Sequence, residues 1–121
     1  MPLRTGHAAL EVEAVGGVTV VQFRDRHILS AAAVQALGQQ LGGLAAGLDR
    51  CKLVLNFGNV ERLSSAVLGQ VVALDRAMRR AGGRLALCGV RPDLSPLFTI
   101  TRLDRYLDLH PSEGEALQAL L

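Results

Sequence analysis

The chain has 121 residues, of which half are hydrophobic and only 3% aromatic, and its formal net charge is +2. This length allows one domain with a single core, which must be built from Leu, Val, Ala and Ile. The arginines are dispersed and mostly interleaved with Asp or Glu, which argues against nucleic-acid binding by a basic patch. No apolar run is long enough to cross a bilayer, so we expect no membrane insertion and a cytoplasmic protein.

Strands and helices alternate along the predicted secondary structure. The predicted elements, in chain order, are strands Ala8–Ala14 and Val18–Phe23, helix Ala31–Leu44, strand Lys52–Phe57, helix Ala66–Ala81, strand Arg84–Cys88, helix Leu94–Thr101, strand Tyr106–Leu109 and a terminal helix after Ser112. This order predicts an α/β fold with a mostly parallel sheet and right-handed crossovers. Residues 1–7 lack periodicity and are expected to fray, which leaves a single domain over residues 8–121.

Individual residues mark the ends of several elements. Gly16-Gly17 is expected to form a hairpin turn, and Gly82-Gly83 to end the preceding helix in a left-handed cap. Ser30 and Ser112 are suitable N-caps, and Glu115 follows Ser112 at the spacing of a capping box.

Few other side chains suggest chemistry. The three histidines, His7, His27 and His110, fall in predicted loops or ends without partners at metal-ligand spacing, so we expect no metal and no cofactor. Phosphate-binding glycine motifs and a Gly-x-Ser-x-Gly elbow are missing from the sequence, which favours a protein without enzymatic activity. Cys51 and Cys88 are interpreted as reduced residues that pack at strand edges.

The nearest approach to a basic cluster is Arg79-Arg80 with Arg84. Asp75 lies one helical turn before Arg79, a spacing at which opposite charges attract on a helix surface. We therefore expect an ion pair on a solvated helix face.

The strongest candidate site is the Ser64-Ser65 pair between the predicted strand Lys52–Phe57 and the predicted helix Ala66–Ala81. A hydroxyl at such a junction faces the first free backbone N–H groups of the helix and can cap it. It can also carry a phosphate, because the helix dipole favours negative charge there. Leu63 either staples the entry of the helix or contacts a partner.

Several stretches of the sequence, taken together, resemble the STAS domain of bacterial anti-sigma factor antagonists and sulfate transporter tails. They are Lys52–Val60, Leu63–Gly69, Ala81–Gly89, Phe98–Asp104 and Pro111–Leu117. The resemblance implies a small α/β fold, with a four- to five-stranded, mostly parallel mixed sheet and about four helices, and no catalytic activity.

In the antagonists of this family, an anti-sigma factor that is also a serine kinase phosphorylates the first serine of an Asp-Ser-Ser-Gly or Asp-Ser-Thr-Gly motif. Only the unmodified antagonist binds the anti-sigma factor, and a serine phosphatase resets the switch. The resemblance therefore implies that Ser64, or alternatively Ser65, is the phosphorylated residue. The partner is expected to bind the face around it, which comprises Arg62, Leu63, Ser64, Ser65, Val67 and Leu68.

The motif departs from the family pattern at two positions. Leu63 stands where the family has Asp, and Ala66 where it has Gly. Three hypotheses therefore stay open: a phosphorylation switch; a constitutive interaction module, such as a scaffold or a subunit of a lipid-transport complex; and an enzyme or small-ligand site that uses Ser64.

Overall fold

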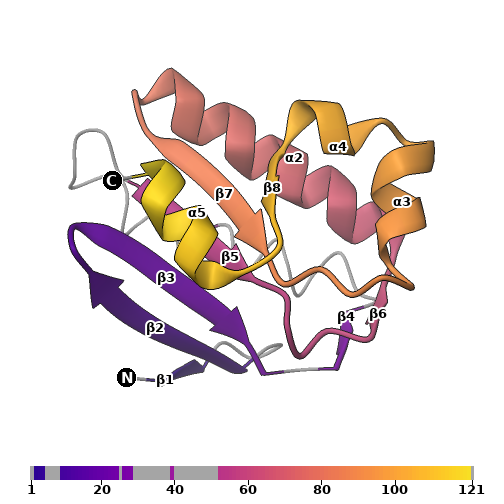
Figure 1. Cartoon of the computed structure of the whole chain (residues 1–121), viewed down its shortest axis with the longest axis horizontal. Coiled ribbons are helices and arrows are strands. Elements are labelled where there is room, and N and C mark those ends of the chain that lie inside the picture. Colours follow the sequence, from indigo (N-terminus) through magenta and orange to yellow (C-terminus); the bar gives the residue numbers. More distant parts are fainter. Residues whose placement is uncertain (1, 5–8, 25, 29–38, 40–51, 121) are drawn as a thin grey trace.

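A mixed sheet of six strands, in the order β1-β2-β3-β5-β7-β8, forms the centre of the molecule (Figure 1). The computed structural model describes residues 2–4, 9–24, 26–28, 39 and 52–120. The strands of the sheet are β1 (Pro2–Arg4), β2 (Ala9–Val15), β3 (Val18–Phe23), β5 (Lys52–Asn56), β7 (Arg84–Cys88) and β8 (Asp108–His110). β1, β2 and β3 pair antiparallel, whereas β3, β5, β7 and β8 run parallel. The predicted α/β class and the mostly parallel mixed sheet are confirmed.

The hairpin between β2 and β3 turns at Gly16 and Gly17. Both glycines have positive φ, 57° and 84°, which is what a two-residue type I′ hairpin turn requires. Val15 and Val18 are paired directly across the turn. The hairpin is therefore confirmed where the sequence predicts it.

Helices cover both faces of the sheet, because the side chains of each strand alternate between two separate clusters. The described helices are α2 (Ser65–Arg80), α3 (Ser95–Ile100), α4 (Leu103–Tyr106) and α5 (Glu113–Leu120). In β5, Leu53 and Leu55 join the cluster that contains Val67 of α2, whereas Val54 joins the cluster that contains Leu120 of α5. Figure 1 shows α5 lying over the sheet, well separated from α2. The central strands β5 and β7 are buried on both faces, as their continuous apolar runs predict.

The ends of α2 and α5 follow local sequence rules. Gly82 has φ of 78°, its N–H donates to the Arg79 carbonyl at 3.1 Å, and the Gly83 N–H donates to the Met78 carbonyl at 2.8 Å. These two bonds form a Schellman motif and satisfy carbonyls that the helix end leaves free. At the start of α5, the Ser112 hydroxyl accepts the Glu115 N–H at 3.3 Å. Both predicted caps are therefore confirmed.

The structure differs from the prediction in three places. Pro2–Arg4 forms β1 and pairs with β2, where the sequence predicts a frayed end, so the sheet gains a sixth strand. The predicted strand Tyr106–Leu109 begins instead at Asp108, since one turn of helix, closed by the Leu107 N–H on the Leu103 carbonyl at 2.7 Å, precedes it. A small parallel pair, β4 (His27–Ile28) and β6 (Arg62–Leu63), was not predicted.

Several predictions fall outside the described part of the chain. They concern residues 5–7 of the expected frayed end, the cap at Ser30, the helix Ala31–Leu44 and Cys51. Gln39 is the one described residue of that helix, and it is helical. Cys88 is buried, and burial raises the pKa of its thiol to about 11, with Glu113 adding to the effect, so the thiol is protonated at neutral pH. In the described ranges, no helix combines the length and the apolar character that a membrane crossing would need.

The predicted ion pair between Asp75 and Arg79 forms, but its surroundings differ from the prediction. The Arg79 Nε lies 2.9 Å from the Asp75 Oδ2. The Arg79 side chain is 59% exposed, whereas Asp75 as a residue is 0% exposed. Burial raises the pKa of Asp75, and the positive charge of Arg79 opposes that rise. Of the two side chains in this ion pair, only that of Arg79 is therefore solvated.

Candidate functional site

Ser64 occupies the junction between β6 and the long helix α2. Its backbone is extended, with φ −86° and ψ 157°, and its side-chain oxygen accepts the Val67 N–H at 3.3 Å. This is N-cap geometry, so the prediction that Ser64 caps the helix is confirmed. Ser65, the first residue of α2, is exposed, whereas Ser64 is half-buried.

Leu63 fixes the angle at which the chain enters α2. It immediately precedes the N-cap, and Leu68 is the fourth residue of the helix. Both side chains belong to the same buried cluster, which is the arrangement of a hydrophobic staple. Leu63 is also the last residue of β6, in register with Ile28. The staple interpretation of Leu63 is therefore supported by its burial and by its position.

The six residues predicted to contact a partner divide into a surface group and a core group. The surface group consists of Arg62 and Ser65, which are exposed, and Ser64, which is half-buried. The core group consists of Leu63, Val67 and Leu68, which are 6%, 1% and 1% exposed. The three apolar residues of the predicted partner face lie inside the molecule, because they join the cluster that packs α2 against the sheet. Only the surface group is open to a partner in this structure.

The exposed side of α2 beside Ser64 carries short side chains. Ser65, Ala66, Gly69 and Ala73 are all exposed, and they recur at helical spacing from the first turn onward. No acidic residue lies in the first turn of the helix. A phosphate at the start of α2 would therefore meet neither bulky side chains nor like charge from that turn.

A polar hollow of about 500 Å³ lies on the same side of the sheet as Ser64, at the carboxyl ends of the parallel strands β3, β5 and β7. We call it the carboxyl-edge hollow, and its lining residues are Arg24, Arg26, Gly58, Asn59, Glu61 and Arg91. The loop that follows β5 is held against the segment that follows β3, because the Glu61 and Arg62 N–H groups both donate to the Arg26 carbonyl, at 2.6 and 3.0 Å. The same loop leads through β6 directly to Ser64.

The carboxyl-edge hollow has more positive than negative charge in its lining. Glu61 is its single acidic residue and lies between two arginines, 3.6 Å from Arg26 and 3.7 Å from Arg91. Arg24 pairs with Glu11 at 2.9 Å. Pairs this exposed contribute little to stability, so these guanidinium groups are available to an anionic group of a partner.

The arginines of this hollow are dispersed along the sequence, so the sequence pattern did not predict it. Arg24 follows β3 and Arg91 follows β7, and the ends of parallel strands meet at one edge of a sheet. That topological rule was the signal that could have brought them together with Ser64.

Replacement of Ser64 by Ala is expected to lower the free energy of unfolding by about 1 kcal/mol, since the Val67 N–H loses its side-chain acceptor. Ser64→Asp should stay within about 0.5 kcal/mol of wild type, because Asp is an equally good N-cap. Urea unfolding of both variants checks this. Equal stability of Ser64→Ala and wild type would contradict the capping role.

Comparison with known proteins gives a consistent result. The family model of the STAS domain matches residues 9–116. A solved structure of a STAS domain protein from Planctomyces limnophilus is 21% identical, with a TM-score of 0.81 and coverage of 92% of this chain and 97% of that chain. An anti-sigma factor antagonist from Mycobacterium paratuberculosis is 28% identical, with a TM-score of 0.76 and coverage of 92% of each chain. The phosphorylated form of the Bacillus cell fate determinant SpoIIAA is 17% identical, with a TM-score of 0.66 and coverage of 93% and 99%.

Proposed function

The chain belongs to the STAS domain family, and from this premise we propose that it is a non-enzymatic regulatory protein of the anti-sigma factor antagonist type. In this proposal, the face around Ser64 binds an anti-sigma factor that is also a serine kinase. Phosphorylation of Ser64 by that partner weakens the binding, and a serine phosphatase restores it. Such a switch operates in the cytoplasm, where its kinase, its phosphatase and ATP are available.

The observation that carries the proposal is the position of Ser64 at the start of α2. The hydroxyl caps the helix and lies at the surface, next to the exposed residues Arg62 and Ser65. Among the similar structures, SpoIIAA of Bacillus exists in a phosphorylated and an unphosphorylated form. The equivalent modification here would place a phosphate at the positive end of the helix dipole, where the free domain tolerates it.

The same phosphate would act differently once a partner is bound. It would add nearly two negative charges to a face whose side chains are short, where a partner can approach α2 closely. A buried charge without a partner costs several kcal/mol, so the complex would weaken while the free domain stays folded. The proposed switch therefore acts on binding and leaves folding unchanged.

The test measures binding of the purified chain to its candidate kinase, by calorimetry with and without ATP. We expect the wild-type chain to bind without ATP, and Ser64→Asp to lose binding at least tenfold. Ser64→Ala should bind and remain unmodified by ATP on peptide mapping. Ser95→Asp is the matched control, because Ser95 is an exposed serine that begins another helix, α3.

A constitutive interaction module is the second candidate, and the burial of Leu63 favours it. Where the family motif has an acid, this chain has a side chain that is 6% exposed, so the kinase would meet no acidic group there. If Ser64→Asp binds its partner as tightly as wild type, and if neither serine accepts phosphate, the switch is excluded. A scaffold or a subunit of a lipid-transport complex would then be the remaining function.

A further inference from the structure

A second hollow, of about 340 Å³, lies at the opposite edge of the sheet from Ser64, where β7 and β8 begin and α2 ends. We call it the amino-edge hollow, and its lining residues are Arg79, Arg84, Leu85, Arg105, Tyr106, Leu107 and Asp108. Its three arginines come from three elements, namely the last turn of α2, the first residue of β7 and the short helix α4. Its volume lies within the usual range of small-molecule sites.

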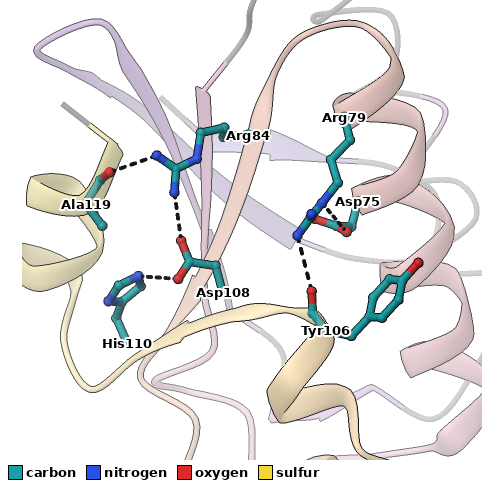
Figure 2. Close-up of polar contacts among 7 residues, drawn as sticks. All are labelled: Asp75, Arg79, Arg84, Tyr106, Asp108, His110 and Ala119. Atoms are coloured by element: carbon teal, nitrogen blue, oxygen red, sulfur yellow. Dashed lines mark hydrogen bonds and ion pairs between the residues drawn. The ribbon is translucent and has the colours of Figure 1, made fainter.

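Two of the guanidinium groups are held in place by protein acceptors (Figure 2). Arg79 donates through Nη2 to the Tyr106 carbonyl at 3.2 Å, and its Nε lies 2.9 Å from the Asp75 carboxylate. Arg84 donates to the Ala119 carbonyl at 3.1 Å and to Asp108 at 3.4 Å. An arginine has five N–H donors, so each of these two groups retains donors for a ligand while its orientation is fixed.

Arg105 has no such structural role among the described residues. Its side chain is exposed, and it takes part in none of the hydrogen bonds or ion pairs found there. Arg80, by contrast, is an exposed arginine in the last turn of α2, next to Arg79 in the sequence, that does not line the hollow. The two residues therefore form a matched pair, one inside the hollow and one outside it.

The charges around the amino-edge hollow favour an anion. Three arginines and one carboxylate, Asp108, line it. Asp108 is already engaged by Arg84 and by His110, whose Nε2 lies 2.9 Å from its Oδ1. Asp75 lies behind Arg79 and is fully buried, so it faces the hollow only through the guanidinium that it orients. His110 is thus a half-buried residue with a carboxylate partner and not the isolated loop residue that the sequence predicts.

We propose that the amino-edge hollow binds the phosphoryl group of a small phosphate ester. Guanidinium donors from three separate elements suit a tetrahedral group with three terminal oxygens better than a planar carboxylate, which two donors satisfy. Leu85 and Leu107 also line the hollow, but they are 3% and 4% exposed, so the contacts offered to the ester are mainly polar. This site is independent of the proposed function, because Ser64 lies at the other end of α2.

The test is an NMR titration of the full chain, in phosphate-free buffer at physiological ionic strength, with inorganic phosphate, glycerol 3-phosphate, succinate and glycerol. We expect saturable shifts confined to the amino-edge hollow with glycerol 3-phosphate, weaker ones with inorganic phosphate, and none with glycerol. Arg105→Ala should weaken glycerol 3-phosphate binding about tenfold, while Arg80→Ala leaves it unchanged. Thermal unfolding of both variants should match wild type, since neither side chain has a structural partner among the described residues.

Three outcomes would overturn the proposal. They are the lack of saturable shifts with either phosphate compound, equal effects of Arg105→Ala and Arg80→Ala, and succinate binding as tight as that of the ester. None of these outcomes bears on partner binding at Ser64, so the two proposals succeed or fail separately.

Discussion

Replacing Leu63 with Asp, the residue of the family motif, is expected to lower the free energy of unfolding by about 4 kcal/mol at neutral pH. The side chain is 6% exposed and belongs to the main buried cluster. The substitution removes the packing of Leu63 against the cluster and places a carboxylate among its apolar side chains. The loss is measured by urea unfolding, with the same dependence of the unfolding free energy on urea concentration assumed for both proteins.

Two control variants separate the charge from other effects of this change. Leu63→Met keeps the volume and apolar character, and is expected to stay within about 1.5 kcal/mol of wild type. Ala66→Gly restores the other family residue at an exposed position, and should cost about 1 kcal/mol or less through helix propensity. Near-wild-type stability of Leu63→Asp would contradict the staple, because it would mean that residue 63 can turn to solvent.

The expected loss also explains the departure from the family motif in physical terms. Leu63 pairs with Ile28 in β4 and shares a cluster with Leu68 of α2. The acid is therefore replaced by a residue that holds the strand and the helix together. A return to the acid would require changes elsewhere in the core, so restoring the motif at this one position is not expected to create a better kinase substrate.

The parts of the fold that could be predicted are those set by local chemistry. The turn at Gly16-Gly17 needs positive φ at two successive residues, and Gly82 needs it at the end of α2. Ser64 and Ser112 cap their helices through bonds that span three residues. The short pair β4–β6 and the edge strand β1 depend on backbone pairing between segments far apart in sequence, and such pairing leaves no periodic pattern.

In the candidate site, too, local features could be predicted and features that depend on distant segments could not. The sequence identified the serine at the helix start, because capping is a local property. It could not decide whether Leu63 is a staple or a contact residue, since that depends on what lies beneath it. It also separated Arg91 from Arg24 and Arg26 by a long stretch of chain, whereas the parallel strand order brings all three to one hollow.

The second large effect is expected at the buried carboxyl group of Asp75. Arg79→Met should lower the free energy of unfolding by about 2 kcal/mol at neutral pH, because it leaves a buried carboxylate without its counter-charge. Asp75→Asn should cost less, since the arginine left behind is 59% exposed and remains hydrated. The double variant should resemble Asp75→Asn alone, because the unpaired buried charge is then gone.

The contribution of Asp75 to stability is expected to depend on pH. The pKa of Asp75 is raised by burial, so the folded state binds its proton more tightly than the unfolded state does. Its contribution to stability is therefore greatest in acid and falls as the pH rises from about 4 toward the raised pKa. Arg79 opposes the rise, so its removal should matter little in acid and most at neutral pH. Urea unfolding of the wild type, the two single variants and the double variant at pH 4 and pH 7 checks this. If Arg79→Met loses the same stability at both pH values, Arg79 acts through its bond to the Tyr106 carbonyl and not through Asp75.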